Sequence, residues 1–533
     1  MSIRALLLGL DGATFTVLDP LMQRGVMPNL SAIVQRGTRA PLRTVMPVLT
    51  PPAWTSLMTG KRPGKHGVFD FFQKEAGDSE YFRFTNSQDI RTATIWSIAS
   101  EHGQRVISLN FPQMFPPPDV LGCVVPGGWM PWRQLRLGCH PPGLFDRLKQ
   151  LPSFNPRELA LDMTLEAKAI EGCPDEEYGD WIELHTRREE RWFQIVRHLM
   201  SEEPAELVGV MFDGVDKLQH LCWRFLDPAH MPERPSPWEQ RMTALCERYF
   251  ERLDAMIGEL VALAGEQATV VLASDHGFGP TRRVFYLNAW LAQQGYLTWA
   301  AADAPQSAVE IGFGKMTRHV YELDLERTVA YAATPSSQGI HIVTAATNGT
   351  RRLSPEERAQ IAAELIAALR EIRDPETGEP VVSEIWSRAE AFAGPHEELA
   401  PDISVILAGG AAVSILRSDT LFRSRAQTRG SHRWEGIFVA SGPRIPSGAS
   451  VDELSILDVA PLLLYCLGLP IPLDVDGVVP RQALVPGALE QRPPLWSAGD
   501  AARPATAPVQ APAYGPDAQE TIVNRLRALG YVE

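Results

Sequence analysis

Short, almost continuous apolar runs recur along the chain, and each is followed closely by an acidic residue. The clearest runs are residues 3–10, 207–212 and 268–273. Apolar runs of this length without alternation are typical of strands buried on both faces of a parallel sheet. Stretches with helical periodicity separate them. The pattern therefore predicts an α/β fold built on a mostly parallel central sheet.

Several stretches between the apolar runs show helical periodicity or composition. They are residues 18–36, 93–103, 164–200, 242–263 and 355–373. Pro28 marks a break inside the first of them, and Ser354 precedes the last as a predicted N-cap. Residues 105–110 form a further predicted strand, and residues 403–407 and 437–440 resume short strands of the core.

The regular alternation of strand and helix weakens after residue 281, which predicts an inserted subdomain. Residues 112–142 are rich in Pro, Gly and Trp and are expected to form an extended loop over the ligand-binding edge of the sheet. The predicted units are a core in two parts (1–281 and 402–479), a cap (282–401), a Pro- and Ala-rich tail (480–517) and a docking helix (518–533).

The composition describes an ordinary globular protein of 533 residues, with 45% apolar and 21% charged residues. A net charge of −14 disfavours binding to a nucleic acid polymer, which needs a basic surface. The six cysteines are scattered, which fits buried thiols in a reducing compartment. The N-terminal apolar run lacks a cleavage site, and residues 455–469 are too short to span a membrane. We therefore expect a cytoplasmic protein.

One hydroxyl residue, Thr50, lies in an unusual setting within residues 46–72. Pro51 and Pro52 follow it and suit the first turn of a helix, where an N–H would be unpaired. A helix N-terminus favours negative charge, whether that of a phosphate or of the threonine's own alkoxide. Taken alone, Thr50 could equally be a helix N-cap.

Six further residues nearly all fall at strand ends or in the turns just after them: Asp11, Asp216, His220, Asp275, His276 and His432. In a parallel α/β sheet, ligand sites gather at the carboxyl ends of the strands. Asp216 and His220 are four residues apart, so a helix would place both on one face. Each residue alone also has an ordinary explanation, such as a turn cap, a surface ion pair or an uninvolved histidine.

Three carboxylates and three imidazoles suit two divalent cations with nitrogen and oxygen ligands, such as Zn²⁺. Mn²⁺ would accept the same donors. Trp54, close to Thr50, is a candidate for an apolar wall that contacts the substrate, although an aromatic residue there could also belong to the core. Lys61, Arg62 and Lys65 could receive a phosphate group, or could simply be solvated.

In these residues the chain resembles the type I phosphodiesterase/nucleotide pyrophosphatase family of the alkaline phosphatase superfamily, in its cytoplasmic prokaryotic branch. The resemblance covers most of the chain. It rests on the ordered segments LGLDGA, TPPAWTSLMTGKRPGKHGVFDF, DKLQH, SDHGFGP, GSHRWEGIFVASGP, ILDVAPLLLYCLGLPIPLDVDG and LRALGYV. It implies an alkaline-phosphatase-like fold, with the sheet between helical layers, and hydrolysis of a small phosphate ester such as a nucleotide.

The resemblance also implies roles for single residues. Asp11, Asp275 and His276 would hold one metal ion together with the Thr50 oxygen, and the other ligands, Asp216, His220 and His432, would hold the second. Thr50 would be the nucleophile and form a phospho-threonine intermediate. The family's asparagine, which binds a phosphoryl oxygen shortly after the nucleophile, is absent from residues 51–54, so nucleotide pyrophosphatase activity in the narrow sense is not implied.

Other functions on the same framework stay open at this point. They are a phosphomonoesterase, a phosphomutase, a phosphonate hydrolase and a catalytically silent binding protein. A sulfatase is disfavoured because the Cys/Ser-x-Pro-x-Arg motif is absent from the stretch around Thr50. Measured hydrolysis products and bound metal would distinguish the remaining alternatives.

Overall fold

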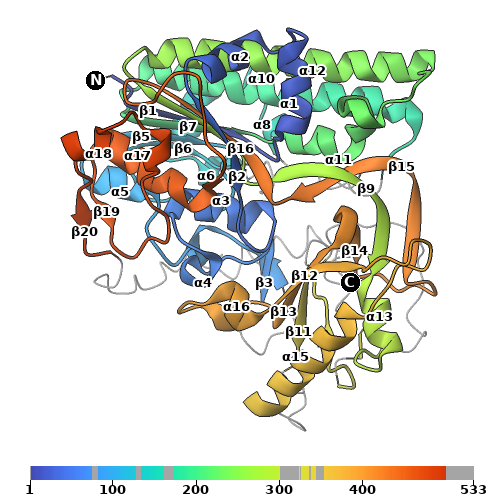
Figure 1. Ribbon diagram of the computed structural model, residues 1–533. Coiled ribbons are helices and arrows are strands. Elements are labelled where there is room, and N and C mark those ends of the chain that lie inside the picture. The colour runs from blue at the N-terminus through green and yellow to red at the C-terminus, as the bar shows by residue number, and fades with distance from the viewer. Residues whose placement is uncertain are drawn as a thin grey trace, which may run out of the picture.

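The computed structural model describes residues 2–74, 82–127, 134–160, 168, 172–300, 323–324, 326–334, 338–343 and 353–499 (Figure 1). The predicted C-terminal docking helix and the second half of the Pro- and Ala-rich tail lie outside these residues. Among the helices that the structure describes, none combines the length and the apolar character needed to cross a bilayer.

A central sheet of nine strands forms the body of the molecule. Strands β1, β5, β6, β7 and β8 run parallel to one another, whereas β16 runs antiparallel between β8 and β2. In order across the sheet the strands are β17 (Ala449–Ser450), β2 (Thr38–Arg43), β16 (Glu435–Ser441), β8 (Thr269–Ala273), β1 (Ala5–Leu10), β7 (Leu207–Phe212), β5 (Val106–Leu109) and β6 (Gly122–Val125), with β18 (Leu454–Ser455) beside β2. The predicted mostly parallel sheet is confirmed.

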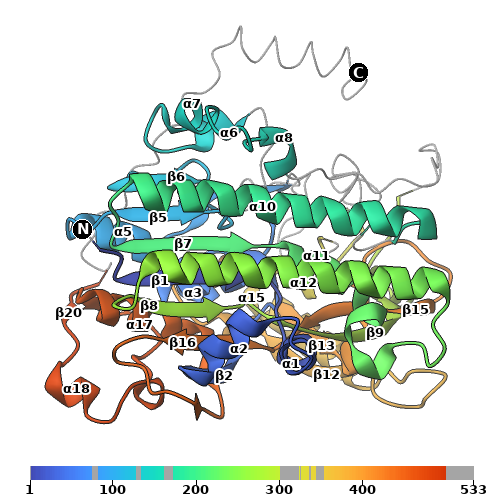
Figure 2. The same cartoon turned by 90° about the horizontal axis from the view of Figure 1, so that it is seen from above.

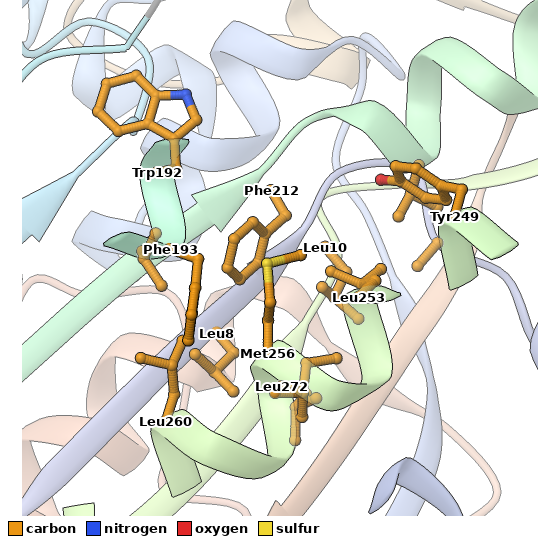
Figure 3. Close-up of a cluster of buried hydrophobic side chains, with 14 of the residues drawn as sticks. Leu8, Leu10, Trp192, Phe193, Phe212, Tyr249, Leu253, Met256, Leu260 and Leu272 are labelled. Atoms are coloured by element: carbon orange, nitrogen blue, oxygen red, sulfur yellow. The ribbon is translucent and has the colours of Figure 1, made fainter. Parts of the chain in front are cut away.

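One face of the sheet is covered by the helices α1 (Phe15–Gln23), α2 (Pro28–Gln35), α10 (Tyr178–Glu202), α11 (Gly214–Leu226) and α12 (Pro237–Ala264). The long helices α10 and α12 run nearly along the strands (Figure 2). Leu8 and Leu10 of β1, Phe212 of β7 and Leu272 of β8 point toward this layer and cluster with Leu253, Met256 and Leu260 of α12 (Figure 3). The shorter α6 (Leu135–Gly138), α7 (Leu144–Leu148) and α8 (Pro156–Leu159) lie beyond the β6 edge.

The opposite face of the sheet is covered by α3 (Thr50–Thr59), α5 (Ile95–Glu101) and α17 (Val459–Leu467). Alternate residues of each strand point this way, as the two-residue period of a strand requires. Leu7, Met211 and Val271 are examples. Because every residue of β1, β7 and β8 is buried, these strands have apolar side chains on both faces, which is why their position could be predicted from continuous apolar runs.

A second, four-stranded sheet lies beside the body and is built mainly from the inserted residues. Its strands are β10 (Ala330–Tyr331), β11 (Gly339–Ile342), β13 (Ile403–Leu407) and β12 (Val382–Ser387). Helices α13 (Leu287–Gln293) and α15 (Pro355–Arg370) share an apolar core with it, and α16 (Arg388–Phe392) follows β12. Ser354 caps α15 with its side chain, as predicted.

Three local predictions are wrong. Residues 403–407 were expected to resume the core, but β13 pairs with β11 and β12, so the second sheet extends past residue 401. Residues 112–142 include β6, which pairs with β5 at the edge of the central sheet, where an extended loop was expected. Residues 480–491 were assigned to a surface tail, yet Ala483 and Leu484 are buried and α18 (Ala488–Gln491) packs on the body. Each error concerns long-range pairing that local composition does not show.

A three-stranded sheet connects the body to the second sheet. It consists of β14 (Ala412–Ser414), β9 (Gly277–Tyr286) and β15 (Phe422–Arg433). Strand β9 leaves the end of β8, and β15 runs antiparallel to β9 back toward β16. Two small pairs complete the fold: β3 (Phe72–Lys74) with β4 (Phe82–Phe84), and β19 (Ile471–Pro472) with β20 (Trp496–Ser497); α4 (Pro63–His66) follows α3.

The packing of α3 on β1 provides a test of this core. A Cβ atom added to Gly9 would lie 2.6 Å from Cη2 of Trp54 and 3.2 Å from Cγ of Met211. We therefore expect Gly9→Ala to destabilise the protein by about 1–3 kcal/mol through overpacking. Gly179→Ala is the matched control, because its Cβ would meet only Leu245 at 3.7 Å, an ordinary contact. Urea denaturation measures both, and equal stability of the two variants would contradict this packing.

Candidate active site

The carboxyl ends of three neighbouring strands bring the predicted acidic residues together. Asp11 directly follows β1, and Asp275 follows β8 after one intervening residue. Asp216 lies in the first turn of α11, which begins two residues after β7. Because β1, β7 and β8 are parallel neighbours, these ends lie at one edge of the sheet. All three carboxylate residues are buried there.

His432 reaches the same place through long-range strand pairing. It lies opposite Phe278 in the β9–β15 ladder, and Phe278 is two residues after His276 in the chain. The His276 and His432 rings stack with their centroids 3.7 Å apart and an interplanar angle of 22°. The pairing of β15 with β9 thus joins a histidine near the C-terminal part of the chain to the turn after β8.

Thr50 begins α3 at the same edge. The N-cap of α3 is Leu49, which makes no side-chain capping bond, so Thr50 is not the cap that it could have been. Its hydroxyl Oγ1 lies 3.5 Å from Nε2 of His276. Pro51 and Pro52 have no N–H to donate. A negative charge at this helix end can therefore be stabilised by the Thr50 amide and the helix dipole.

The six predicted ligands form two groups, Asp216–His220–His432 and Asp11–Asp275–His276. Within each group one candidate ligand atom per residue lies within 4.8 Å of the others. In the first group, Oδ1 of Asp216 is 3.5 Å from His220 Nε2 and 3.3 Å from His432 Nε2. In the second, His276 Nε2 is 3.2 Å from Asp275 Oδ2 and 3.8 Å from Asp11 Oδ1. This division matches the one that the resemblance implied.

Each of the three imidazoles is oriented by a backbone carbonyl on its Nδ1 side. The carbonyls belong to Gly430 for His220 (3.3 Å), Val48 for His432 (3.0 Å) and Gly277 for His276 (3.2 Å). If Nδ1 carries the proton and donates to the carbonyl, each Nε2 presents a lone pair toward the carboxylates. The Nε2 atoms of His220 and His432 then face each other at 3.1 Å with no proton between them.

Three carboxylate oxygens at the site lack a hydrogen-bond donor among the described residues. They are Oδ1 of Asp11, Oδ1 of Asp216 and Oδ2 of Asp275, and all three are buried. Buried polar atoms are normally paired, because an unpaired one loses its hydration without compensation. Lone pairs from nitrogen and oxygen that converge without donors are what a divalent cation requires, so the residues fit a pair of metal sites.

The electrostatics of the site show the same lack of positive charge. Burial raises the pKa of Asp11 well above its usual range, and the charges of Asp275 and Asp216 raise it further. Burial also raises the pKa of Asp275, to about 7. Burial lowers the pKa of His276 well below its usual range and that of His220 to about 4. His220 and His276 are therefore neutral at neutral pH, and their surroundings resist the ionisation of Asp11 and Asp275.

Asp216 is the exception among the carboxylates. Burial tends to raise its pKa, but its interactions with His220 and Lys217 outweigh burial and hold the pKa well below its usual range. Lys217 Nζ lies 3.3 Å from Asp216 Oδ2. The sequence interpretation did not single out Lys217, although its place inside the DKLQH segment, next to Asp216, was a signal that could have identified it.

Two supporting residues also escaped the sequence interpretation. Gln219 donates from Nε2 to the carbonyl of Gly12 (2.7 Å) and so ties α11 to the turn after β1. Glu189 of α10 accepts the amide of Gly214 at the start of α11 (2.5 Å). Both are buried and fix the helix that carries Asp216 and His220. Nothing in the local sequence around Glu189 distinguishes it from the other acidic residues of a polar helix.

The expectation that Trp54 contacts the substrate is wrong. Its side chain has no exposed surface, and its ring packs edge-on against Phe111 with centroids 5.4 Å apart. Trp54 lies one turn beyond Thr50, on the side of α3 that faces Gly9 of the sheet. The two lysines considered for phosphate binding are also engaged elsewhere, since Lys61 pairs with Asp474 (2.7 Å) and Lys65 with Asp476 (2.6 Å).

Comparison with known families decides the relationship. The family described as type I phosphodiesterase / nucleotide pyrophosphatase matches residues 5–435, which include Thr50 and all six predicted metal ligands. The chain belongs to this family. Its members are metal-dependent enzymes that act on small phosphate esters, and this chain is accordingly a phosphoester hydrolase by family.

Solved structures include several with similar folds. One is murine ectonucleotide pyrophosphatase/phosphodiesterase 5 in an inactive form with AMP, at 14% identity and a TM-score of 0.48, covering 88% of this chain and 96% of that one. Another is phosphonoacetate hydrolase from Sinorhizobium meliloti 1021 with phosphonoacetate, at 18% identity and a TM-score of 0.49, covering 88% and 95%. No curated protein matches the sequence.

The raised pKa of Asp275 makes a prediction for the metal-free protein. An unfolded aspartate has a pKa of about 3.9, so between that value and the folded value near 7 the native state binds more protons. Ionisation of Asp275 therefore lowers the free energy of unfolding as pH rises through this range. Asp275→Asn removes the charge, keeps an acceptor for the Gly12 amide and can donate to His276, so it should stabilise the metal-free protein increasingly as pH rises.

Urea denaturation in the presence of a chelator, at pH 5 and at pH 8, measures this effect. The stability difference between Asp275→Asn and wild type should grow by on the order of 1–2 kcal/mol over that interval. The exposed Asp452→Asn is the control and should show no such growth. A difference for Asp275→Asn that stays constant with pH would contradict the raised pKa.

Proposed function

We propose that this protein is a two-metal phosphodiesterase that acts through a phospho-threonine intermediate on Thr50. The observation that carries the proposal is the convergence of three imidazole nitrogens and three donor-free carboxylate oxygens in two adjacent groups, with the Thr50 hydroxyl beside one of them. A silent binding protein has no physical need for these buried groups, because they destabilise the fold without a cation.

Asp11, Asp275 and His276, with the Thr50 oxygen, would hold one ion, and Asp216, His220 and His432 the other. Mixed nitrogen and oxygen donors suit Zn²⁺, and Mn²⁺ accepts the same set. When bound, the two ions would supply positive charge that favours an ionised Thr50 hydroxyl and a negatively charged leaving oxygen. The carbonyls of Gly430, Val48 and Gly277 would fix the imidazole orientations as outer partners.

Thr50 would act as the nucleophile. Its Oγ1 forms a bond to phosphorus while the bond to the leaving oxygen breaks; the hydroxyl proton passes to solvent, and the leaving alkoxide takes up a proton from water to give the alcohol. Water then displaces the threonine oxygen from the phosphoryl group. Two displacements in line give overall retention of configuration at phosphorus. The N-terminal end of α3 supports this role, because its dipole and the Thr50 amide favour the negative charge that develops there.

The substrate is proposed to be a small phosphate ester, with a nucleotide among the candidates and a diester preferred over a monoester. The cytoplasmic location expected from the sequence stays a prediction. All six cysteines are free, which agrees with the reducing compartment on which that prediction rests.

Hydrolysis of bis(p-nitrophenyl) phosphate beside p-nitrophenyl phosphate tests the proposed activity. Metal-stripped protein should be inactive, and Zn²⁺ or Mn²⁺ should restore turnover with the diester preferred. A monoester preference would instead make the protein a phosphatase. Turnover of neither compound by protein with two bound ions would favour a phosphomutase or a phosphonate hydrolase, to be identified by their products. Failure to bind metal would refute the enzyme proposal.

Thr50 variants separate catalysis from metal binding. Thr50→Ala should lower kcat by at least about 10³-fold, the scale expected when an acting nucleophile is removed. It should nevertheless keep close to two metal ions per chain, because six ligands remain. Thr50→Ser is the matched control, since it keeps the hydroxyl and should retain measurable turnover. Undiminished activity of Thr50→Ala would show that another group attacks phosphorus.

A further inference from the structure

A cleft of about 400 Å³ lies at the C-terminal end of α11, outside the candidate active site. Arg224 of α11, His230 of the following loop, Arg282 of β9, and Gln427 and Thr428 of β15 contribute to its lining. Neither Thr50 nor any of the six predicted metal ligands lines it. The proposed mechanism therefore leaves the cleft without a role.

The cleft is nevertheless close to the site, because the same two elements carry both. Asp216, His220 and Arg224 follow one another at intervals of four residues in α11, so they lie on successive turns of one helix face. At a rise of about 1.5 Å per residue, Arg224 is roughly 6 Å beyond His220 along the helix axis. On the other side, β15 runs from Thr428 at the cleft to His432 at the site.

The elements that line the cleft also carry two of the predicted metal ligands. Thr50 lies beside His276 of one ligand group, whereas His220 and His432 of the other group lie on α11 and β15, which both contribute to the cleft. In an in-line displacement the leaving alcohol departs opposite the nucleophile. Under the proposed mechanism, an alcohol expelled by Thr50 would leave on the side of His220 and His432, from which α11 and β15 lead to the cleft.

Two arginines, Arg224 and Arg282, line the cleft in a protein whose net charge is −14. Strands β9 and β15 carry two and four arginines and no acidic residue, and of these six arginines Arg282 is the one in the lining. Arg283 is neutralised by Asp374 and Glu376. Arg282 in the cleft donates from Nε to Thr428 (2.6 Å), and no carboxylate of the described residues lies within ion-pair distance of it. Burial, reinforced by the charge of Arg429, lowers the pKa of Arg425 to about 10.

Arg224 is held rigidly in place by aromatic rings. Its guanidinium carbon lies 4.6 Å from the ring centroid of Phe225, 5.3 Å from that of Trp238 and 5.8 Å from that of Tyr178. Its side chain is only 13% exposed, and its Nε and Nη2 have no hydrogen-bond partner among the described residues. The nearest carboxylate oxygen of Glu239 is 4.0 Å from Nη1 of Arg224, and the other oxygen of Glu239 accepts a hydrogen bond from the Ser236 amide. The guanidinium is thus preorganised and not fully satisfied.

We infer that this cleft binds a second anionic group of the ester substrate, a carboxylate or phosphate on the leaving alcohol, separated from the scissile phosphate by roughly 6–12 Å. Arginine suits this role because its planar guanidinium pairs with carboxylate and phosphate oxygens through two parallel hydrogen bonds. The inference rests on the proposed phosphodiesterase function and narrows it to substrates with a negatively charged substituent.

Calorimetric binding to metal-loaded Thr50→Ala protein tests this inference without turnover. The probes are methyl 6-carboxyhexyl phosphate and its uncharged counterpart, methyl heptyl phosphate. The carboxylate compound should bind at least about tenfold more tightly, the scale of one charge-assisted hydrogen bond. Adding Arg282→Gln should abolish most of this preference. Arg423→Gln removes an exposed arginine of β15 that does not line the cleft, and should leave the preference intact.

The outcomes distinguish the cleft from the activity. Equal binding of the two probes, or equal loss of preference in Arg282→Gln and Arg423→Gln, would overturn the inference even if bis(p-nitrophenyl) phosphate is hydrolysed. A preference that depends on Arg282 would support it even if no turnover is found, in which case the proposed function alone would fail. In the otherwise wild-type enzyme, Arg282→Gln should leave hydrolysis of bis(p-nitrophenyl) phosphate within about twofold, since that diester has no second anion.

Discussion

Buried negative charge at the carboxyl edge of the central sheet is the constraint on which the rest of the structure depends. Asp11, Asp216 and Asp275 lie where water cannot solvate them, and each has an oxygen without a donor among the described residues. Backbone carbonyls beside the Nδ1 atoms orient the neighbouring imidazoles so that their Nε2 atoms present lone pairs, and not protons, to these carboxylates. Such an arrangement is unfavourable for folding alone and becomes favourable with divalent cations present.

The fold holds these groups together through elements that are themselves rigid. β1, β7 and β8 are buried on both faces, so the strand ends that position the acids cannot shift without disturbing two apolar layers. Helix α11 is tied to the turn after β1 by Gln219 and to α10 by Glu189. The β9–β15 ladder extends from this edge and carries His432 at one end and a basic cleft farther along. The same ladder thus links the predicted ligand His432 to the proposed substrate-binding cleft.

The sequence predicted those features that depend on local pattern. β7 was placed to the residue, because a strand buried on both faces is apolar at every position. Asp11 and Asp275 were found because they follow such strands. The partnership of His432 with Asp216 depends on β15 pairing with β9, which periodicity does not reveal, and only the family resemblance indicated it. The wrong predictions for Trp54 and β13 have the same origin. Trp54 packs against Gly9, and β13 pairs with β12, so both depend on residues far away in the chain.

Anomalous diffraction from crystals of the metal-loaded protein tests the central claim most directly. Recorded at the zinc edge, it should show two ions per chain. One should lie about 2.0–2.2 Å from ligand atoms of Asp216, His220 and His432, and the other at similar distances from Asp11, Asp275 and His276. Two such peaks would establish that the buried charge at the sheet edge is a pair of metal sites. If either ligand group lacks a peak within bonding distance, the claim of two metal sites is contradicted.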